Sequence, residues 1–126
     1  MQFADYIYVD DYGYNNFETI KEHIEKRKKY IPNPFYVLIL NEYNSQIEFM
    51  EFMYLLQLHY KKREPLIVGI AETYESAELL ACHMVENCMI KVKDLDYIAY
   101  LSSLPEISED EVLPKMLRIS GGKMYA

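Results

Sequence analysis

The sequence predicts a small α/β domain with the element succession β-α-β-α-β-α. Its sheet is expected to be mostly parallel, with three or four strands flanked by helices and a helical segment at the C-terminal end. Three apolar runs bounded by turn residues, at positions 3–9, 35–40 and 66–71, are typical of buried strands. Because helical patterns separate these runs, right-handed crossovers between parallel strands are expected. Strand orders 2-1-3 and 1-2-3 both remain open.

The length of the chain is that of one domain. Its 126 residues are enough for a substantial apolar core, and 51% of them are hydrophobic. We expect a single domain over residues 1–120, followed by a flexible tail over 121–126 that begins at Gly121-Gly122.

The N-terminal part is expected to form a strand, a loop and a surface helix. The strand over 3–9 leads into Asp10-Asp11, and the sequence Tyr12-Gly13-Tyr14-Asn15 predicts a turn-rich loop. Asn15 followed by Glu18 resembles a helix cap with an acid in the first turn. Apolar residues then recur at helical spacing, namely Phe17, Ile20, Ile24 and Ile31.

The central unit, residues 35 to 62, is expected to contain a buried strand, a short loop and a long helix. Ser45 and Glu48 have the spacing of a capping box, which predicts that a helix begins there. Pro65 prevents its continuation, so the helix is expected to end near Lys62.

This predicted helix is too apolar for one core. Its apolar positions cover roughly 220° of the circumference, against the ~100° that face a single core. We therefore expect a second covering surface, either another copy of the chain or the chain's own C-terminal segment. The expected interface residues are Phe49, Phe52, Met53 and Leu56.

The third strand, over 66–71, contains Gly69, which predicts a close approach by a helix or loop. Thr73 is the expected cap of an amphipathic helix that continues to about Cys88. Beyond it, residues 94–104 fit a short helix or an edge strand, and the helix is favoured. A further helix is expected to begin near Ser108 or, alternatively, at Pro114.

The charge balance bounds the partners. A net charge of −7 argues against a broad nucleic-acid interface, so no nucleic acid is expected. No run reaches the ~18 apolar residues of a membrane span, and the N-terminus lacks the features of a signal peptide. Cys82 and Cys88 lie too far apart on one helix for a disulfide, and free thiols indicate a cytoplasmic protein.

Acidic residues follow each of the three predicted strands. If the strands are parallel, Asp10, Asp11, Glu42 and Glu72 meet at one edge of the sheet, where ligands of α/β proteins bind. Oxygen ligands in that arrangement suit Mg²⁺ and a phosphate-bearing molecule. Helix dipoles also favour acids at these positions without any function, and no structural metal site or resident cofactor is expected.

No complete catalytic constellation is present. The Gly-rich phosphate loops and the GxSxG motif are absent, and Cys82 beside His83 points in a different direction from it on a helix. The sequence favours a cytoplasmic interaction or regulatory module that self-associates as a homodimer through residues 45–62. The alternatives are a Mg²⁺-dependent or phosphate-binding domain and a regulatory subunit that binds a different protein.

Overall fold

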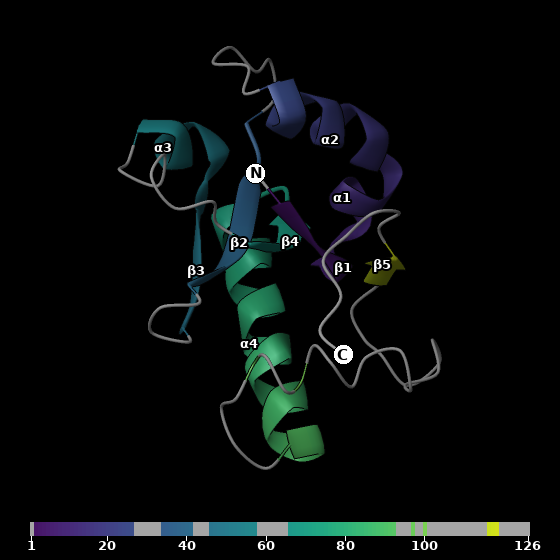
Figure 1. Cartoon of the computed structure of the whole chain (residues 1–126), viewed down its shortest axis with the longest axis vertical. Helices are drawn as coiled ribbons and strands as arrows, with labels where there is room; N and C mark the ends of the chain where they lie inside the picture. The colour runs from purple at the N-terminus through teal and green to yellow at the C-terminus, as the bar shows by residue number, and fades with distance from the viewer. Residues whose placement is uncertain are drawn as a thin grey trace.

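The computed structural model describes residues 2–26, 34–41, 46–57, 66–92, 97, 100 and 116–118. These residues form a five-stranded mixed sheet with helices on both faces (Figure 1). The strand order is β3-β2-β4-β1-β5. An α/β arrangement is therefore confirmed, although the sheet differs from the expected one. The strands are β1 (Gln2–Val9), β2 (Tyr36–Asn41), β3 (Gln46–Glu51), β4 (Leu66–Ala71) and β5 (Met116–Arg118).

The prediction of a mostly parallel sheet is wrong. Only β1 and β4 pair in parallel, whereas β2 is antiparallel to both β3 and β4, and β5 is antiparallel to β1. Tyr36, at the start of β2, lies beside Ala71, at the end of β4. The chain therefore enters β2 at the end of the sheet where β1 finishes. The connection from β1 to β2 does not have to return to the other end of the sheet. Neither of the two strand orders considered from the sequence is the observed one.

The prediction of a long central helix is also wrong. Residues 46–51 form β3, and only α3 (Phe52–Gln57) is helical in the described part of this stretch. β3 pairs along its whole length with β2, with Leu38 opposite Phe49. An apolar strand adjacent in sequence offers cross-strand partners for the alternate residues of β3, and this pairing outweighs the local helical preference.

The predicted loop after β1 is instead a short helix. α1 (Asp11–Asn15) begins directly after Asp10, whose side chain caps it, and α2 (Phe17–Lys26) follows. Gly13 is buried within α1 because this turn lies against the end of β4. A Cβ atom at Gly13 would lie 3.0 Å from the backbone oxygen of Ile70, so the packing leaves little room for a side chain there.

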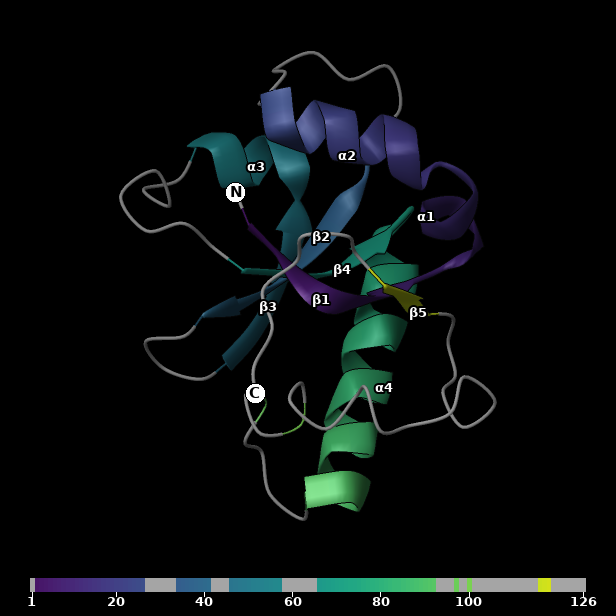
Figure 2. The same ribbon diagram turned by 45° about the vertical axis from the view of Figure 1, so that its right-hand side comes forward.

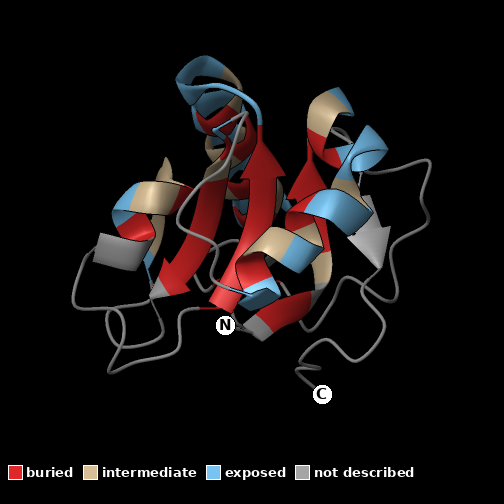
Figure 3. Ribbon diagram, turned by 90° about the horizontal axis from the view of Figure 1, so that it is seen from above, coloured by how far each residue is buried: buried red, intermediate tan, exposed pale blue. Residues whose placement is uncertain are grey.

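Two layers of helix enclose the sheet. α4 (Tyr74–Val92) packs on one face, and α2 and α3 cover the other (Figure 2). Phe17 of α2 contacts Phe3, and Phe52 of α3 stacks on Phe35, whereas Tyr36 points to Tyr74 of α4. The strands between these layers are mostly buried (Figure 3). All six residues of β4 are buried, as expected for the central strand.

The start of α4 confirms the predicted cap. Ser76 donates its backbone N–H to Oγ1 of Thr73 at 3.1 Å, and the N–H of Thr73 donates to Oγ of Ser76 at 3.0 Å. Cys82 and Cys88 do not form a disulfide with each other, and the first is exposed whereas the second is buried.

The predicted close approach at Gly69 is present, but its source is neither a helix nor a loop. The nearest atoms to an added Cβ belong to Leu38 of β2, at 3.1 Å and 3.2 Å, and to the backbone oxygen of Tyr8, at 3.2 Å. Gly69 therefore makes room between the large side chains of its two neighbouring strands.

The C-terminal expectations fall mainly on residues outside the described ones. Of residues 94–104, the structure describes only Tyr97 and Tyr100, both helical and buried. Residues 108–115 and the tail over 121–126 lie outside the description. A helix from Pro114 is contradicted, because residues 116–118 form β5.

Replacing Gly13 by Ala tests the packing of α1 against β4. Alanine ordinarily favours a helix over glycine by about 1 kcal/mol. Here we expect the opposite sign, a loss of about 1–3 kcal/mol in the free energy of unfolding, because the backbone of β4 must shift to admit the new Cβ atom. Urea denaturation measures it, with exposed Asn15→Ala as the control. Equal or greater stability of Gly13→Ala would contradict this packing argument.

Candidate functional site

The carboxylate of Asp10 lies where the parallel strands β1 and β4 end. Its Oδ1 accepts a hydrogen bond from the backbone N–H of Gly13 at 2.7 Å, and its Oδ2 accepts one from the backbone N–H of Glu72 at 2.8 Å. The first contact caps α1, and the second connects β1 to the segment that leaves β4. Both carboxylate oxygens of Asp10 therefore serve the backbone.

The predicted acidic site is brought together only in part. Because β1 and β4 are parallel, Asp10 and Glu72 meet at the end of the sheet where both strands finish. Asp11 follows as an exposed residue of α1. Glu42 lies outside the described residues. However, β2 runs antiparallel to β4, so the strand that precedes Glu42 finishes at the opposite end of the sheet from Asp10.

This arrangement offers little for a cation in the described part of the chain. No group of three or more His, Cys, Asp or Glu side chains suited to a metal ion occurs among those residues. What the Asp10 carboxylate does in this fold is satisfy two backbone donors, which is a structural task.

Tyr12, on α1, lies near Asp10 and Glu72, and the sequence did not indicate it as a site residue. Its side chain is half-buried, and this burial raises the pKa of its hydroxyl. The nearby carboxylates of Glu72 and Asp10 raise it further, because they oppose a second negative charge. A neutral phenol beside two acids is available as a hydrogen-bond donor. Only the fold of α1 over the end of β4 could have indicated it.

A second polar group lies inside the core. The hydroxyls of Tyr8 on β1 and Tyr100 are hydrogen-bonded to each other, and Nδ2 of Asn87 on α4 donates to the Tyr8 hydroxyl at 2.9 Å. Tyr8 is 0% exposed and Tyr100 is 1% exposed. Burial raises the pKa of both hydroxyls. These hydrogen bonds connect Tyr100 to Tyr8 of the sheet, and through Tyr8 to Asn87 of α4. Both tyrosine side chains are buried, so a ligand has no access to them.

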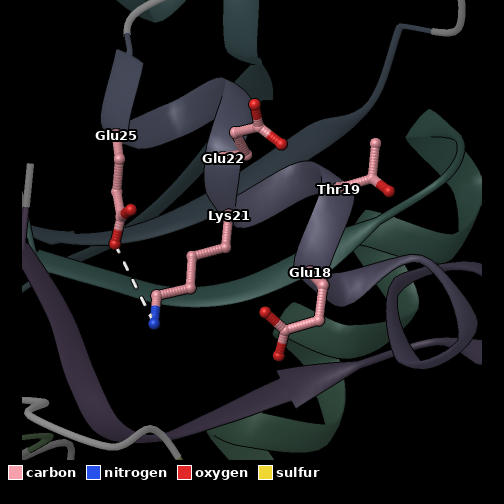
Figure 4. A pocket seen from close by; sticks show the side chains of 5 residues that line it. All are labelled: Glu18, Thr19, Lys21, Glu22 and Glu25. Atoms are coloured by element: carbon pink, nitrogen blue, oxygen red, sulfur yellow. Dashed lines mark ion pairs between the residues drawn. The ribbon is translucent and has the colours of Figure 1, made fainter.

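The outer side of α2 carries a hollow lined by charged side chains (Figure 4). Lys21 pairs with Glu25 at 3.9 Å, and Lys26, beyond the hollow, pairs with Glu22 at 2.7 Å. These i,i+4 pairs are typical of a solvated helix surface. All residues of the hollow belong to one helix, so it is a surface feature without convergent groups. They are Glu18, Thr19, Lys21, Glu22 and Glu25.

The two histidines in the described part of the chain lie on different helices. His23 lies half-buried on α2, and its Nδ1 atom has no hydrogen-bond partner there. His83 lies half-buried on α4, and His59 is outside the description.

The predicted interface residues lie on two elements instead of one helix. Phe52 is 0% exposed and stacks on Phe35 with ring centres 5.2 Å apart, so it belongs to the core of its own chain. Phe49 on β3 and Met53 on α3 are half-buried. Leu56 lies in α3, and its side chain is outside the description.

β3 is the outermost strand on one side of the sheet. In the part of the chain that the structure describes, it pairs only with β2. Ile47, Phe49 and Met50 are half-buried along it. Phe49 contacts Tyr74 of α4 with ring centres 5.3 Å apart, and Tyr74 itself is 52% exposed. This apolar edge is the candidate functional surface.

Comparisons with protein-family models, with curated proteins and with solved structures found no match for this chain. Among the helices that the structure describes, none combines the length and the apolar character needed to cross a membrane.

The buried tyrosine pair predicts a loss of stability at high pH. An unfolded tyrosine ionises near pH 10, whereas Tyr8 and Tyr100 have raised pKa values in the folded chain. Their contribution is therefore complete below about pH 10 and declines as the pH rises above it, by up to about 1.4 kcal/mol per pH unit for each group.

Urea denaturation between pH 8 and 11 checks this expectation. Tyr8→Phe combined with Tyr100→Phe should reduce the alkaline decline, whereas Tyr54→Phe, at a residue 55% exposed, should leave it unchanged. Identical pH dependence of the wild type and the double variant would show that the pair does not control alkaline unfolding.

Proposed function

We propose that this chain is a protein-interaction module of the cytoplasm that acts without catalysis and self-associates through residues 46–57. The observation that carries the proposal is the position of β3 at the edge of the sheet, with an apolar surface along it. An edge strand presents a row of backbone N–H and C=O groups that can pair with a strand of another molecule.

The composition of β3 supports this use of its edge. Its sequence, QIEFME, contains no proline and no lysine, two residues with which proteins commonly block strand pairing at an edge. Ile47, Phe49 and Met50 supply apolar area that is only partly covered. Burying such side chains between two molecules provides a driving force for association of about 25 cal/mol per Å².

Neighbouring aromatic residues extend this surface. Tyr74 covers Tyr36 and Phe49 while remaining 52% exposed, and Tyr54 on α3 is 55% exposed. Tyrosine is enriched in protein interfaces because it combines a large apolar body with a polar tip. A partner that pairs with β3 would reach these rings as well.

The mass of the protein in solution tests the proposal. Size exclusion coupled to light scattering, over a range of concentrations, should give about twice the chain mass of 15.0 kDa. Ile47→Asp places a charge in the edge surface and should return the mass to that of one chain. Ile90→Asp is the matched control, because Ile90 is 77% exposed on α4, and it should stay dimeric.

Circular dichroism establishes that both variants remain folded. A wild-type mass of 15.0 kDa at every concentration would remove the support for self-association. The same dimer in Ile47→Asp as in the wild type would place the interface elsewhere.

A second candidate function uses the acids at the ends of β1 and β4. The meeting of Asp10 and Glu72 at one edge, with exposed Asp11 nearby, favours a Mg²⁺-dependent or phosphate-ligand-binding domain. Against it stands the use of both Asp10 oxygens by backbone donors.

Thermal unfolding with and without Mg²⁺ separates the two functions. Under the first proposal we expect an unchanged melting temperature, because no cation site is formed. Under the second, a ligand at 100 times its Kd adds about 2.7 kcal/mol to stability. That gain should disappear when Asp10→Asn and Glu72→Gln are combined.

A further inference from the structure

We infer that two copies of this chain join strand β3 to strand β3 in antiparallel pairing, about a twofold axis that passes between the two Phe49 residues. This inference rests on the proposed self-association and specifies its geometry. The partner is a second copy of the chain, and the two sheets continue into each other through the paired edges.

The two faces of β3 limit the possible registers. Phe49 contacts Tyr74 of α4, so the side chains of Ile47, Phe49 and Glu51 lie on the face that α4 covers. Gln46, Glu48 and Met50 lie on the other face. A twofold axis perpendicular to the sheet keeps each face on its own side. Residues directly opposite each other across the axis must therefore come from the same face.

This rule leaves four registers that pair three or more residues of the strand. An axis at Ile47 pairs only residues 46–48 and leaves Phe49 and Met50 without a partner strand. An axis at Glu48 places that carboxylate opposite its own copy, where like charges destabilise the pair. An axis at Met50 carries Glu48 beyond the end of the partner strand, because its counterpart would be Phe52, the first residue of α3. Only residues 49–51 would then pair.

An axis at Phe49 avoids these costs. Ile47 then faces Glu51 of the second copy, Glu48 faces Met50, and the two Phe49 rings face each other. Residues 47–51 all pair, and no carboxylate lies directly opposite another. With a net charge of −7 on each chain, separating the acids of the interface is a strong constraint on association.

The sign of a charge at position 50 tests this register. Met50→Lys and Met50→Glu remove the same half-buried side chain, so their packing losses are similar. In the inferred dimer residue 50 faces Glu48 of the other copy, and this occurs twice. We therefore expect the lysine variant to dimerise at least about tenfold more tightly than the glutamate variant at low salt. This ratio should shrink in high salt.

Leu79→Lys and Leu79→Glu control for net charge alone. Leu79 is 58% exposed on α4, and its two variants should have nearly equal dissociation constants. Analytical ultracentrifugation measures all four variants. In a register centred on Glu48 residue 50 faces Gln46, and in one centred on Met50 it faces itself. Neither gives lysine the advantage.

Disulfide crosslinking locates the axis without depending on the charged variants. In a Cys82→Ser background, single cysteines are placed at positions 47, 49 and 51 and oxidised. Directly opposed residues have Cβ atoms about 4.5–5.5 Å apart, so crosslinking should be strongest at position 49. Copies of residue 47, or of residue 51, lie about 14 Å apart along the strands and should not crosslink.

The outcomes separate this inference from the proposed function. A wild-type monomer overturns both. A wild-type dimer that shows no lysine advantage at position 50, or that crosslinks best at 47 or 51, overturns the register and leaves self-association standing. A lysine advantage together with a maximum at position 49 supports the inferred dimer.

Discussion

The parallel pairing of β1 with β4 is the constraint on which the rest of the structure depends. β4 is buried on both faces, so it needs a strand on each side and a helical layer above and below. The Asp10 carboxylate closes this pair at its end by accepting hydrogen bonds from Gly13 and Glu72. Because that contact also starts α1, it sets the direction in which the chain leaves β1 and passes over the face opposite α4.

The same constraint explains why β3 lies at an edge. β2 enters beside the end of β4 and runs antiparallel to it, which leaves the hairpin partner of β2 on the outside. β3 is only half-buried, and its apolar residues are more numerous than one side of a sheet requires. The acids Glu48 and Glu51 interrupt this apolar strand, and they limit which strands can pair with it. The many apolar residues of 46–57 are thus divided between the edge strand β3 and the short helix α3.

The sequence predicted the three apolar strands and the helix that Thr73 caps, because burial and capping follow from short local patterns. It failed at residues 46–51, where Ser45 and Glu48 resemble a capping box although the neighbouring strand supplies better partners for Phe49 and Met50. It also failed to predict the antiparallel direction of β2, whose last residues therefore lie at the end of the sheet away from Asp10. Strand direction follows from where the connecting segments pass, and no local pattern records it. The interface predicted on residues 45–62 stays a prediction, and in the fold residues 46–57 of this stretch lie on a strand and a short helix instead of one long helix.

The arrangement of acids on β3 bears on how association would stop at two copies. An apolar edge without charges accepts strands in several registers and is prone to open-ended aggregation. In QIEFME the residues Glu48 and Glu51 oppose apolar partners when the axis lies at Phe49, and Glu48 opposes itself when the axis moves to its own position. A twofold contact uses the same edge of both copies, so it closes on itself.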